Sequence, residues 1–153
     1  MSKMIFISLP VADLTRARTF YEALGFTHNP RFSDETGAAM VWSEAIFVML
    51  LTHDKWKGFT TRPICPTGSS EVSLAITVDS RAEVDALVAA GAAAGGTADA
   101  NPPEDHAFMY QRTLLDPDGH AWEPFWMEPA VANGEEPVGT SEGDQPVVTL
   151  GEW

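Results

Sequence analysis

Apolar and polar residues follow one another in short blocks along the first half of the chain, which predicts one helix among several strands. Residues 5–9 form an apolar run that Pro10 ends, as expected of a short strand. Asp13 follows as a candidate N-cap, and apolar residues then recur at helical spacing until Gly25 ends the pattern. The apolar positions of this predicted helix are Leu14, Ala17, Phe20, Tyr21 and Leu24.

Three more short strands are expected before the middle of the chain, over residues 26–32, 38–43 and 45–52. Turn-forming residues at 34–37 and 43–44 separate them. The first half is therefore predicted to contain one strand, one helix and then three strands.

The second half has the same pattern. Residues 71–78 alternate between apolar and polar positions, and Ser80 with Glu83 matches a capping box that opens a helix. Gly91 is the predicted end of this helix. The remaining predicted elements are strands over 97–100, 108–115 and 120–126 and a loop over 101–106.

The spacing of the helix signals indicates an internal repeat. Asp13 and Gly25 are separated by 12 residues, and so are Asp79 and Gly91. Because the element order and this spacing agree, we expect an α+β fold made of two βαβββ units.

The last predicted strand begins at a hairpin turn, residues 116–119, with Pro and Gly where a type I turn favours them. In this strand Ala121, Glu123 and Phe125 share one face, and His120 and the tryptophans share the other. A carboxylate between apolar neighbours is costly to bury unless it has a partner, so Glu123 is a candidate functional residue. A Glu at an exposed sheet rim, or one paired with Arg112, fits the pattern as well.

Residues 53–70 connect the two halves and contain Pro63, Pro66 and Gly68. The run Lys-Trp-Lys-Gly-Phe at 55–59 fits either a linker with an anchored Trp, which we prefer, or an aromatic and basic lid over a cleft. Cys65 stands alone, which excludes an internal disulfide, and no base adjoins it in the sequence, so an unreactive thiol is expected.

The length of 153 residues and the 44% hydrophobic content suit one domain with a real core. We place this domain at residues 1–128, with units at about 4–52 and 71–128, and an acidic, mostly irregular tail at 129–153. Within the tail, residues 147–150 suit an added edge strand or a contact with a neighbouring subunit. No apolar run is long enough to cross a bilayer and no signal region is present, so no membrane contact and a cytoplasmic location are expected.

The formal net charge of −13 argues against a nucleic-acid partner, because no basic stripe is present to neutralise phosphates. The tail from Glu128 onward holds six acids and no Lys or Arg. This acidity favours a cationic partner over an anionic one, although we prefer solubility as its explanation.

Together, the repeat, the segment 9–14 (Leu-Pro-Val-Ala-Asp-Leu) and the turn 116–120 (Asp-Pro-Asp-Gly-His) resemble the vicinal oxygen chelate superfamily over about residues 4–128. This superfamily includes glyoxalase I, bleomycin resistance proteins, fosfomycin resistance thiol transferases and extradiol dioxygenases. Segments 5–26, 32–35, 48–52 and 105–110 are similar to the branch of predicted lactoylglutathione lyases. The resemblance implies a curled, cup-shaped mixed sheet with helices on its outer face.

The resemblance also implies four metal-ligand positions, typically His or Gln, Glu, His and Glu. In this chain they correspond to Phe6, Leu50, Ser73 and Glu123. Phe and Leu have no lone pair for a metal, and a neutral Ser hydroxyl is a poor substitute for imidazole. We therefore expect no metal site and no cofactor, with a divalent metal at Glu123 as the open alternative.

A cup of this kind would be a mostly apolar pocket for a small molecule. Trp122 and Trp126 would face away from it and pack on the helices. His106, on the loop before residue 108, is a candidate catalytic partner of Glu123. Tyr110 or Arg112 beside it would bind the ligand. The alternative for His106 is a loop histidine that bonds its own backbone. The expected lining comprises Phe6, Ser8, Val48, Leu50, Ser73, Ala75, Ala121, Glu123 and Phe125.

Three functions follow from the resemblance. The first is a metal-independent binding protein for a small organic molecule of cationic or aromatic character. The second is an enzyme, a glyoxalase-like lyase or isomerase with displaced metal ligands or with Glu123 and His106 as acid and base. The third is an interaction module whose cup completes a homodimer, because members of this superfamily commonly dimerise.

Overall fold

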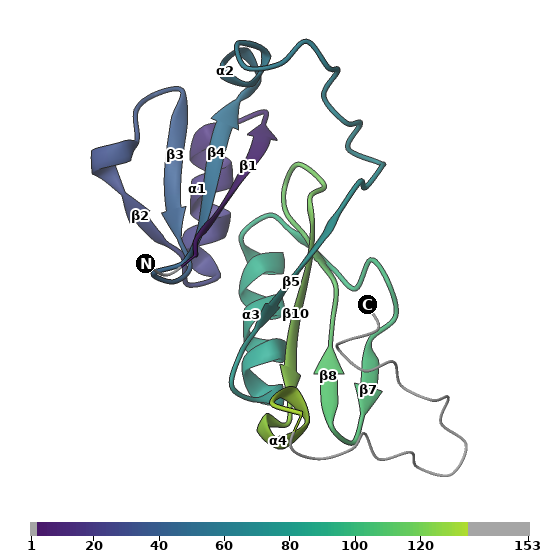
Figure 1. The fold of residues 1–153 in the computed structure, drawn as a ribbon. Coiled ribbons are helices and arrows are strands. Elements are labelled where there is room, and N and C mark those ends of the chain that lie inside the picture. The colour runs from purple at the N-terminus through teal and green to yellow at the C-terminus, as the bar shows by residue number, and fades with distance from the viewer. Residues whose placement is uncertain (1–2, 135–153) are drawn as a thin grey trace.

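The computed structural model describes residues 3–134, which form two units that each contain their own sheet (Figure 1). In the first unit β1 pairs parallel with β4, and β3 and β2 continue the sheet in antiparallel fashion. The predicted order of one strand, one helix and three strands is confirmed. Its elements are β1 (Ile5–Val11), α1 (Leu14–Ala23), β2 (Thr27–Asn29), the 3-10 helix η1 (Pro30–Phe32), β3 (Gly37–Val41) and β4 (Ile46–Thr52).

The second unit has the same order, but two of its strands are each split in two. Its last strand, β10 (Ala121–Met127), pairs parallel with β5 and antiparallel with both β8 and β9. Outside these, β7 pairs with β8 and β6 with β9. The elements before β10 are β5 (Ser73–Thr77), α3 (Arg81–Ala93), β6 (Thr97–Ala98), β7 (Glu104–His106), β8 (Met109–Gln111) and β9 (Leu114–Leu115).

The α+β class with two βαβββ units and helices on the outer face of curled sheets is confirmed. Two short helices lie outside the units, α2 (His53–Lys57) after β4 and α4 (Pro129–Ala132) after β10. Both N-caps predicted for the long helices are present: Asp13 Oδ1 accepts from Arg16 N at 2.9 Å, and Ser80 Oγ accepts from Glu83 N at 3.1 Å. No helix within residues 3–134 has the length and apolarity that crossing a bilayer requires.

Several predicted boundaries are wrong. The 3-10 helix at Pro30 shortens the strand expected over 26–32, because proline lacks the N–H that the ladder needs. The loop expected over 101–106 contains β7, and the strand expected over 108–115 breaks between β8 and β9.

Gly91 does not end α3, which continues to Ala93. A Cβ at Gly91 would collide with the side chain of Leu114, so this glycine allows the helix to approach β9 closely. The glycine with positive φ lies at Gly95, so the equal spacing seen in the sequence does not reflect equal helix lengths.

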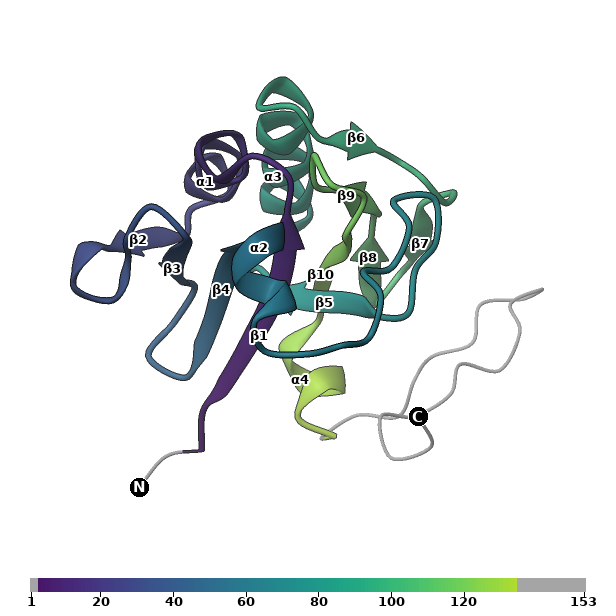
Figure 2. The ribbon, with the colours of Figure 1, turned by 90° about the horizontal axis from the view of Figure 1, so that it is seen from above.

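The core lies between the helices and the sheet faces that they cover. On β1 and β4, Leu9 pairs with Leu50 and Ile7 with Val48, and these side chains face α1. The core of the first unit continues into the second through Trp122, which is fully buried. Figure 2 shows α1 and α3 next to each other, in agreement with their direct packing.

A buried chain of hydrogen bonds joins the two units. Trp122 Nε1 of β10 donates to the hydroxyl of Tyr21 on α1 at 3.0 Å, and that hydroxyl donates to Asp116 Oδ2 at 2.7 Å. The other oxygen of Asp116 accepts from the backbone N–H groups of Asp118 and His120, at 2.9 and 2.8 Å. The turn at 116–119 is therefore held both by its own backbone and by the helix of the other unit.

Three further contacts fasten the same turn to the end of β1 and the start of α1. Asp118 Oδ1 accepts from Ala12 N at 2.8 Å and from Arg16 Nη2 at 3.3 Å. His120 Nε2 lies 2.7 Å from the carbonyl oxygen of Pro10. Because a carbonyl oxygen can only accept, Nε2 carries the proton in this contact.

Burial raises the pKa of the Asp116 carboxyl, and the charge of His120 and the hydrogen bonds from Tyr21 and the turn offset part of this rise. Burial also raises the pKa of the Tyr21 phenol well above its ordinary value, and the nearby carboxylate of Asp116 adds to the effect. The phenol therefore stays neutral and keeps the proton that it donates.

Replacing Tyr21 with Phe should lower the free energy of unfolding by about 1–3 kcal/mol, because the indole N–H and the carboxylate then lose a buried partner. Urea unfolding followed by fluorescence would measure this loss. Tyr110→Phe is the matched control, since its hydroxyl donates to the exposed Asp85 at 2.7 Å and water can replace it. Equal losses in the two variants would contradict the role assigned to Tyr21.

Asp116→Asn should show a specific pH dependence. Because the folded pKa of Asp116 is raised, its stabilising contribution is fully present below the unfolded pKa of about 3.9 and is lost as the pH rises through the folded pKa. Asn does not titrate, so the stability difference between wild type and variant should narrow as the pH rises through this range. Urea unfolding at a series of pH values measures it.

Asp34→Asn provides the opposite control for this experiment. Hydrogen bonds from Thr36 lower the pKa of Asp34, so its contribution is present above the unfolded pKa and is lost as the pH falls. The difference in unfolding free energy between wild type and Asp34→Asn should widen as the pH rises. The same trend in both variants would contradict the assignment for Asp116.

Candidate functional site

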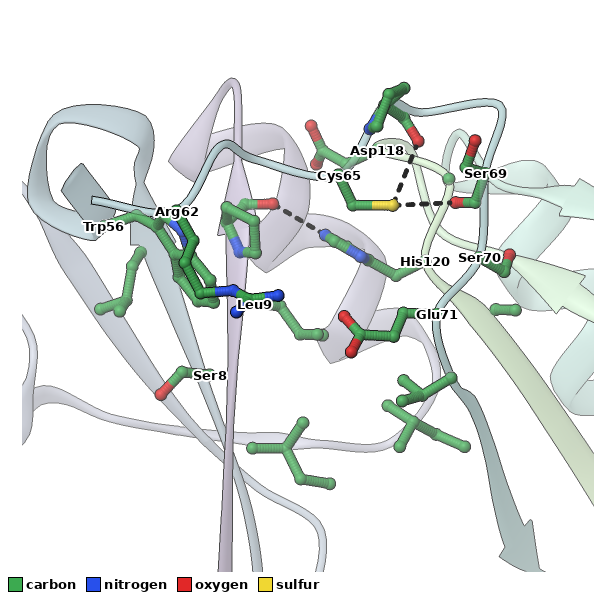
Figure 3. A pocket seen from close by; sticks show the side chains of 18 of the residues that line it. Ser8, Leu9, Trp56, Arg62, Cys65, Ser69, Ser70, Glu71, Asp118 and His120 are labelled. Carbon is green, nitrogen blue, oxygen red and sulfur yellow. Dashed lines mark hydrogen bonds between the residues drawn. The ribbon is translucent and has the colours of Figure 1, made fainter. Parts of the chain in front are cut away.

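A cavity of about 850 Å³ lies between β1, the segment that connects the two units, and the turn that precedes β10 (Figure 3). Its size is typical of pockets that hold small organic molecules. Its lining comprises Phe6, Ile7, Ser8, Leu9, Pro10, Leu51, Trp56, Phe59, Thr60, Arg62, Pro63, Cys65, Pro66, Ser69, Ser70, Glu71, Val72, Leu74, Asp118, Gly119, His120 and Ala121.

The first wall of the cavity is β1 together with the end of β4. Residues with even numbers on β1 point away from α1, which places Phe6 and Ser8 on the cavity side. The ring of Phe6 stacks on Phe47 of β4 with centroids 4.6 Å apart. This wall therefore combines a fixed aromatic surface with one hydroxyl.

The second wall is the connector. Thr52 Oγ1 accepts from Lys55 N at 3.3 Å and so caps α2, which carries the half-buried Trp56 to the cavity. Phe59 follows on the same side, beneath the ammonium group of Lys55. The preferred interpretation of this run as a linker with an anchored Trp is therefore incomplete, because Trp56 and Phe59 also line a pocket.

Several backbone hydrogen bonds of the connector are local. Its backbone donors at Gly58, Phe59 and Ser69 bond within the connector or to α2. At Gly119, which has positive φ, a Cβ would collide with the carbonyl oxygen of Thr67, so the missing side chain lets Thr67 pack directly on the turn.

The third wall is the turn with Asp118 and His120. Only 6% of the Asp118 side chain is exposed, and its Oδ2 is a buried oxygen without a hydrogen-bond partner in the part of the chain that the structure describes. His120 uses Nε2 to bind Pro10, which leaves Nδ1 as its second polar atom. Near the turn, the thiol of Cys65 lies within weak hydrogen-bonding distance of the carbonyl oxygens of Pro66 and Ser69.

The structure brings only part of the predicted lining together. Phe6, Ser8 and Ala121 line the cavity as expected. Leu50 does not, because it is fully buried in the core that faces α1, and Val48 lies beside it on the same face. Their predicted place in the cup is therefore wrong: in this strand Leu51 has the orientation that reaches the pocket.

Glu123 does not line the cavity, although Ala121, two residues earlier on the same strand face, does. Glu123 pairs with Ala75 in the sheet of the second unit, and Ser73 and Phe125 lie on the same face two residues away along the ladder. Within residues 3–134 the Glu123 carboxylate has no ion-pair partner, and Arg112, its suggested partner, binds Asp99 and Asp85 instead. The expectation that Trp122 packs on the helix side is confirmed.

His106 is not brought to Glu123. It pairs with Met109, which in turn pairs with Met127, so it lies two strands away and four residues further along, a separation of well over 10 Å. Its imidazole contacts Glu104 Oε2 at 3.3 Å and stacks on Phe108. A role for His106 as the catalytic partner of Glu123 has no support in this arrangement.

Tyr110 and Arg112 lie on the helix side of the sheet, which corrects their predicted place beside the cup. The Tyr110 hydroxyl donates to Asp85 of α3, and Arg112 bridges the same carboxylate and Asp99. The hydrogen bonds to Asp99 raise the pKa of Arg112, while Asp99 has a lowered pKa for the same reason. These contacts fasten α3 to its sheet.

The four positions implied by the resemblance do not fit a divalent metal. Phe6 offers no donor, and Leu50 is an apolar side chain that points into the core. Ser73 pairs with Ala121, so it does not lie directly opposite Glu123. Among residues 3–134, no group of three or more His, Cys, Asp or Glu side chains is placed to hold a metal ion. The expected absence of a metal stays a prediction.

Comparison with known proteins agrees with the fold. Residues 3–42 match the family described as bleomycin resistance protein-like N-terminal. A hypothetical protein from S. aureus is 26% identical, with a TM-score of 0.68 over 82% of this chain and 95% of that one. A glyoxalase/bleomycin resistance protein from Albidiferax ferrireducens is 27% identical, with a TM-score of 0.59 over 79% and 95%.

A third structure, a glyoxalase/bleomycin resistance protein/dioxygenase family enzyme from Burkholderia phytofirmans, is 19% identical with a TM-score of 0.67 over 82% of this chain and 99% of that one. The chain has the glyoxalase/bleomycin resistance fold. The findings support the vicinal oxygen chelate superfamily as a whole and do not separate its branches. No curated protein matches the chain.

Sequence reasoning missed most of the polar groups of the cavity in this glyoxalase/bleomycin resistance fold. Arg62, Glu71 and His120 all line it, but none shares a strand face with the predicted cup. The one sequence feature that pointed to this cavity was the aromatic and basic run at 55–59, for which a lid over a cleft was one of two interpretations. The position of the turn at 116–120 against Pro10 could not be read from either segment alone.

Proposed function

We propose that this protein binds a small organic molecule in the cavity between β1 and the connector. The observation that supports this is the composition of the walls, which set aromatic side chains against a few polar groups. Apolar surface supplies most of the affinity in such pockets, and the few polar groups orient the ligand. The aromatic residues here are Phe6, Trp56 and Phe59.

The charge of the protein supports a ligand with a cationic group. Glu71 and Asp118, the latter paired with Arg16, place two carboxylates on the cavity walls against the guanidinium of Arg62, and the chain as a whole carries a formal charge of −13. A positive group on the ligand is attracted by both the local and the overall field.

An enzyme of the lactoylglutathione lyase kind is the weaker candidate. It would need a Lewis acid or an acid–base pair near the substrate. Glu123 does not line the cavity, and within residues 3–134 its carboxylate has no ion-pair partner. The superfamily of the fold neighbours hosts several chemistries, so membership in it does not by itself assign a reaction to this protein.

Binding of the neutral, fluorescent dye N-phenyl-1-naphthylamine tests the proposed pocket. The dye should bind the wild-type protein, and Phe6→Ala or Trp56→Ala should weaken binding by about tenfold, because each removes a large apolar contact. Fluorescence titration measures the dissociation constant.

Phe32→Ala is the control for these two variants. Phe32 is also a large exposed aromatic, yet it lies on η1 and not on the cavity. Its removal should leave dye binding unchanged. Failure of the dye to bind, or equal weakening by all three variants, would overturn the location of the pocket.

The proposed partner of this protein, besides its ligand, is a second copy of the chain. The outer edge of β1 has no neighbouring strand in the described part of the chain, and three large apolar side chains lie exposed along its start: Met4, Ile5 and Phe6. Val72, next to β5, adds a further exposed apolar group. Several large exposed apolar side chains at an open strand edge are characteristic of protein interfaces.

Ile5→Lys should therefore convert a dimer into a monomer, because a charge at the centre of an apolar interface is costly to desolvate. Ile5 does not line the cavity, so dye binding can be measured on the same variant to confirm that it is folded. Sedimentation velocity over a concentration series gives the assembly state. Phe32→Lys should remain dimeric, and a wild-type protein that is monomeric throughout would contradict the proposal.

A further inference from the structure

The cavity carries two charged side chains of opposite sign that face each other. Arg62 extends into it from the connector and Glu71 from the opposite side, just before β5 (Figure 3). The ion pairs found among residues 3–134 include neither of them. The guanidinium and the carboxylate are therefore both available to a molecule that lies between them.

His120 adds a third polar group to the same end of the cavity. Its Nε2 is committed to Pro10, and this bond fixes the plane of the ring and leaves Nδ1 as its second polar atom. In a neutral ring with the proton on Nε2, Nδ1 is an acceptor, which suits a hydrogen-bond donor on the ligand. The imidazole and Glu71 together favour a donor group, whereas Arg62 favours an acceptor.

The remaining walls define the rest of the ligand. Phe6, Trp56 and Phe59 offer aromatic surface, and Ser8 is the polar residue of the β1 wall. The cavity volume of about 850 Å³ is ample for an amino acid with a large side chain or for a short peptide. A ligand with a single charge would satisfy one of the two facing side chains and leave the other with water only.

We propose that the ligand is a small aromatic zwitterion of the amino acid or short peptide type. Its carboxylate binds the guanidinium of Arg62, its ammonium group binds the carboxylate of Glu71, and its ring packs on the aromatic wall. This inference rests on the proposed binding function. It extends that function by giving the ligand an anionic group in addition to the cationic one.

Displacement of N-phenyl-1-naphthylamine by two matched ligand sets tests the inference. One set is L-phenylalanine, N-acetyl-L-phenylalanine and L-phenylalaninamide, and the other is L-alanyl-L-phenylalanine with its acetylated and amidated forms. Acetylation removes the ammonium group, and amidation removes the carboxylate. In at least one set the zwitterion should bind about threefold to fivefold tighter than either modified form, the range expected for partly exposed charge pairs.

Two variants connect each preference to one residue. Arg62→Gln should abolish the advantage of the zwitterion over the amide and keep its advantage over the acetylated form. Glu71→Gln should do the reverse. Arg31→Gln and Glu35→Gln change the same charges at exposed positions outside the cavity and should alter neither preference.

The outcomes separate this inference from the binding function on which it rests. If the dye binds in the cavity but wild type does not distinguish the three forms of either ligand, the zwitterion is wrong and the pocket stands. The same conclusion follows if both variants weaken all forms equally. If neither dye nor zwitterion binds, the proposed function fails as well.

Discussion

The hydroxyl of Tyr21 is the contact on which the arrangement of the two units depends. It accepts from the indole of Trp122 and donates to Asp116, so one oxygen links a helix of the first unit to a strand and a turn of the second. All three side chains are buried, which makes each unpaired group costly and the geometry correspondingly strict. The same turn then reaches β1 through Asp118 and His120.

These hydrogen bonds between the units also determine which walls of the cavity are fixed. The β1 wall and the turn wall are bonded to each other and to the core, whereas the connector wall forms its backbone hydrogen bonds locally and rests on the turn at Gly119. Two walls of this pocket are fixed and the third is a loop, so substitutions in the loop alone can alter which ligand the pocket binds. Loops placed on a rigid scaffold commonly carry specificity for this reason.

The location of the pocket separates fold from function in this protein. The superfamily resemblance points to Glu123 as the functional residue. The cavity instead lies at the edge of β1, and Glu123 is not part of its lining. Its chemistry comes from aromatic side chains and from the facing charges of Arg62 and Glu71. A shared fold therefore accounts for the scaffold here, and the site must be argued from its own residues.

The sequence by itself determined the elements and their order, because helix caps and strand alternation are local properties. Asp13 and Ser80 cap the helices as their positions indicate, and alternation along the last strand correctly places Trp122 on the helix side. Alternation did not place Leu50 correctly. Both faces of its strand are apolar, and a period of two does not say which of them packs on the helix. Gly91 failed as a helix stop because its role is to make room for Leu114 of a distant strand.

Only the tertiary structure decided where the site lies. Arg62, Glu71 and His120 are up to 58 residues apart in the chain, and no local pattern relates them. They line the same cavity because the hydrogen bonds of Tyr21 place the turn next to β1, and the connector runs from the first unit to the second beside them. Hydrogen bonds and packing between residues distant in sequence fix such a site, so it does not exist until the chain has folded.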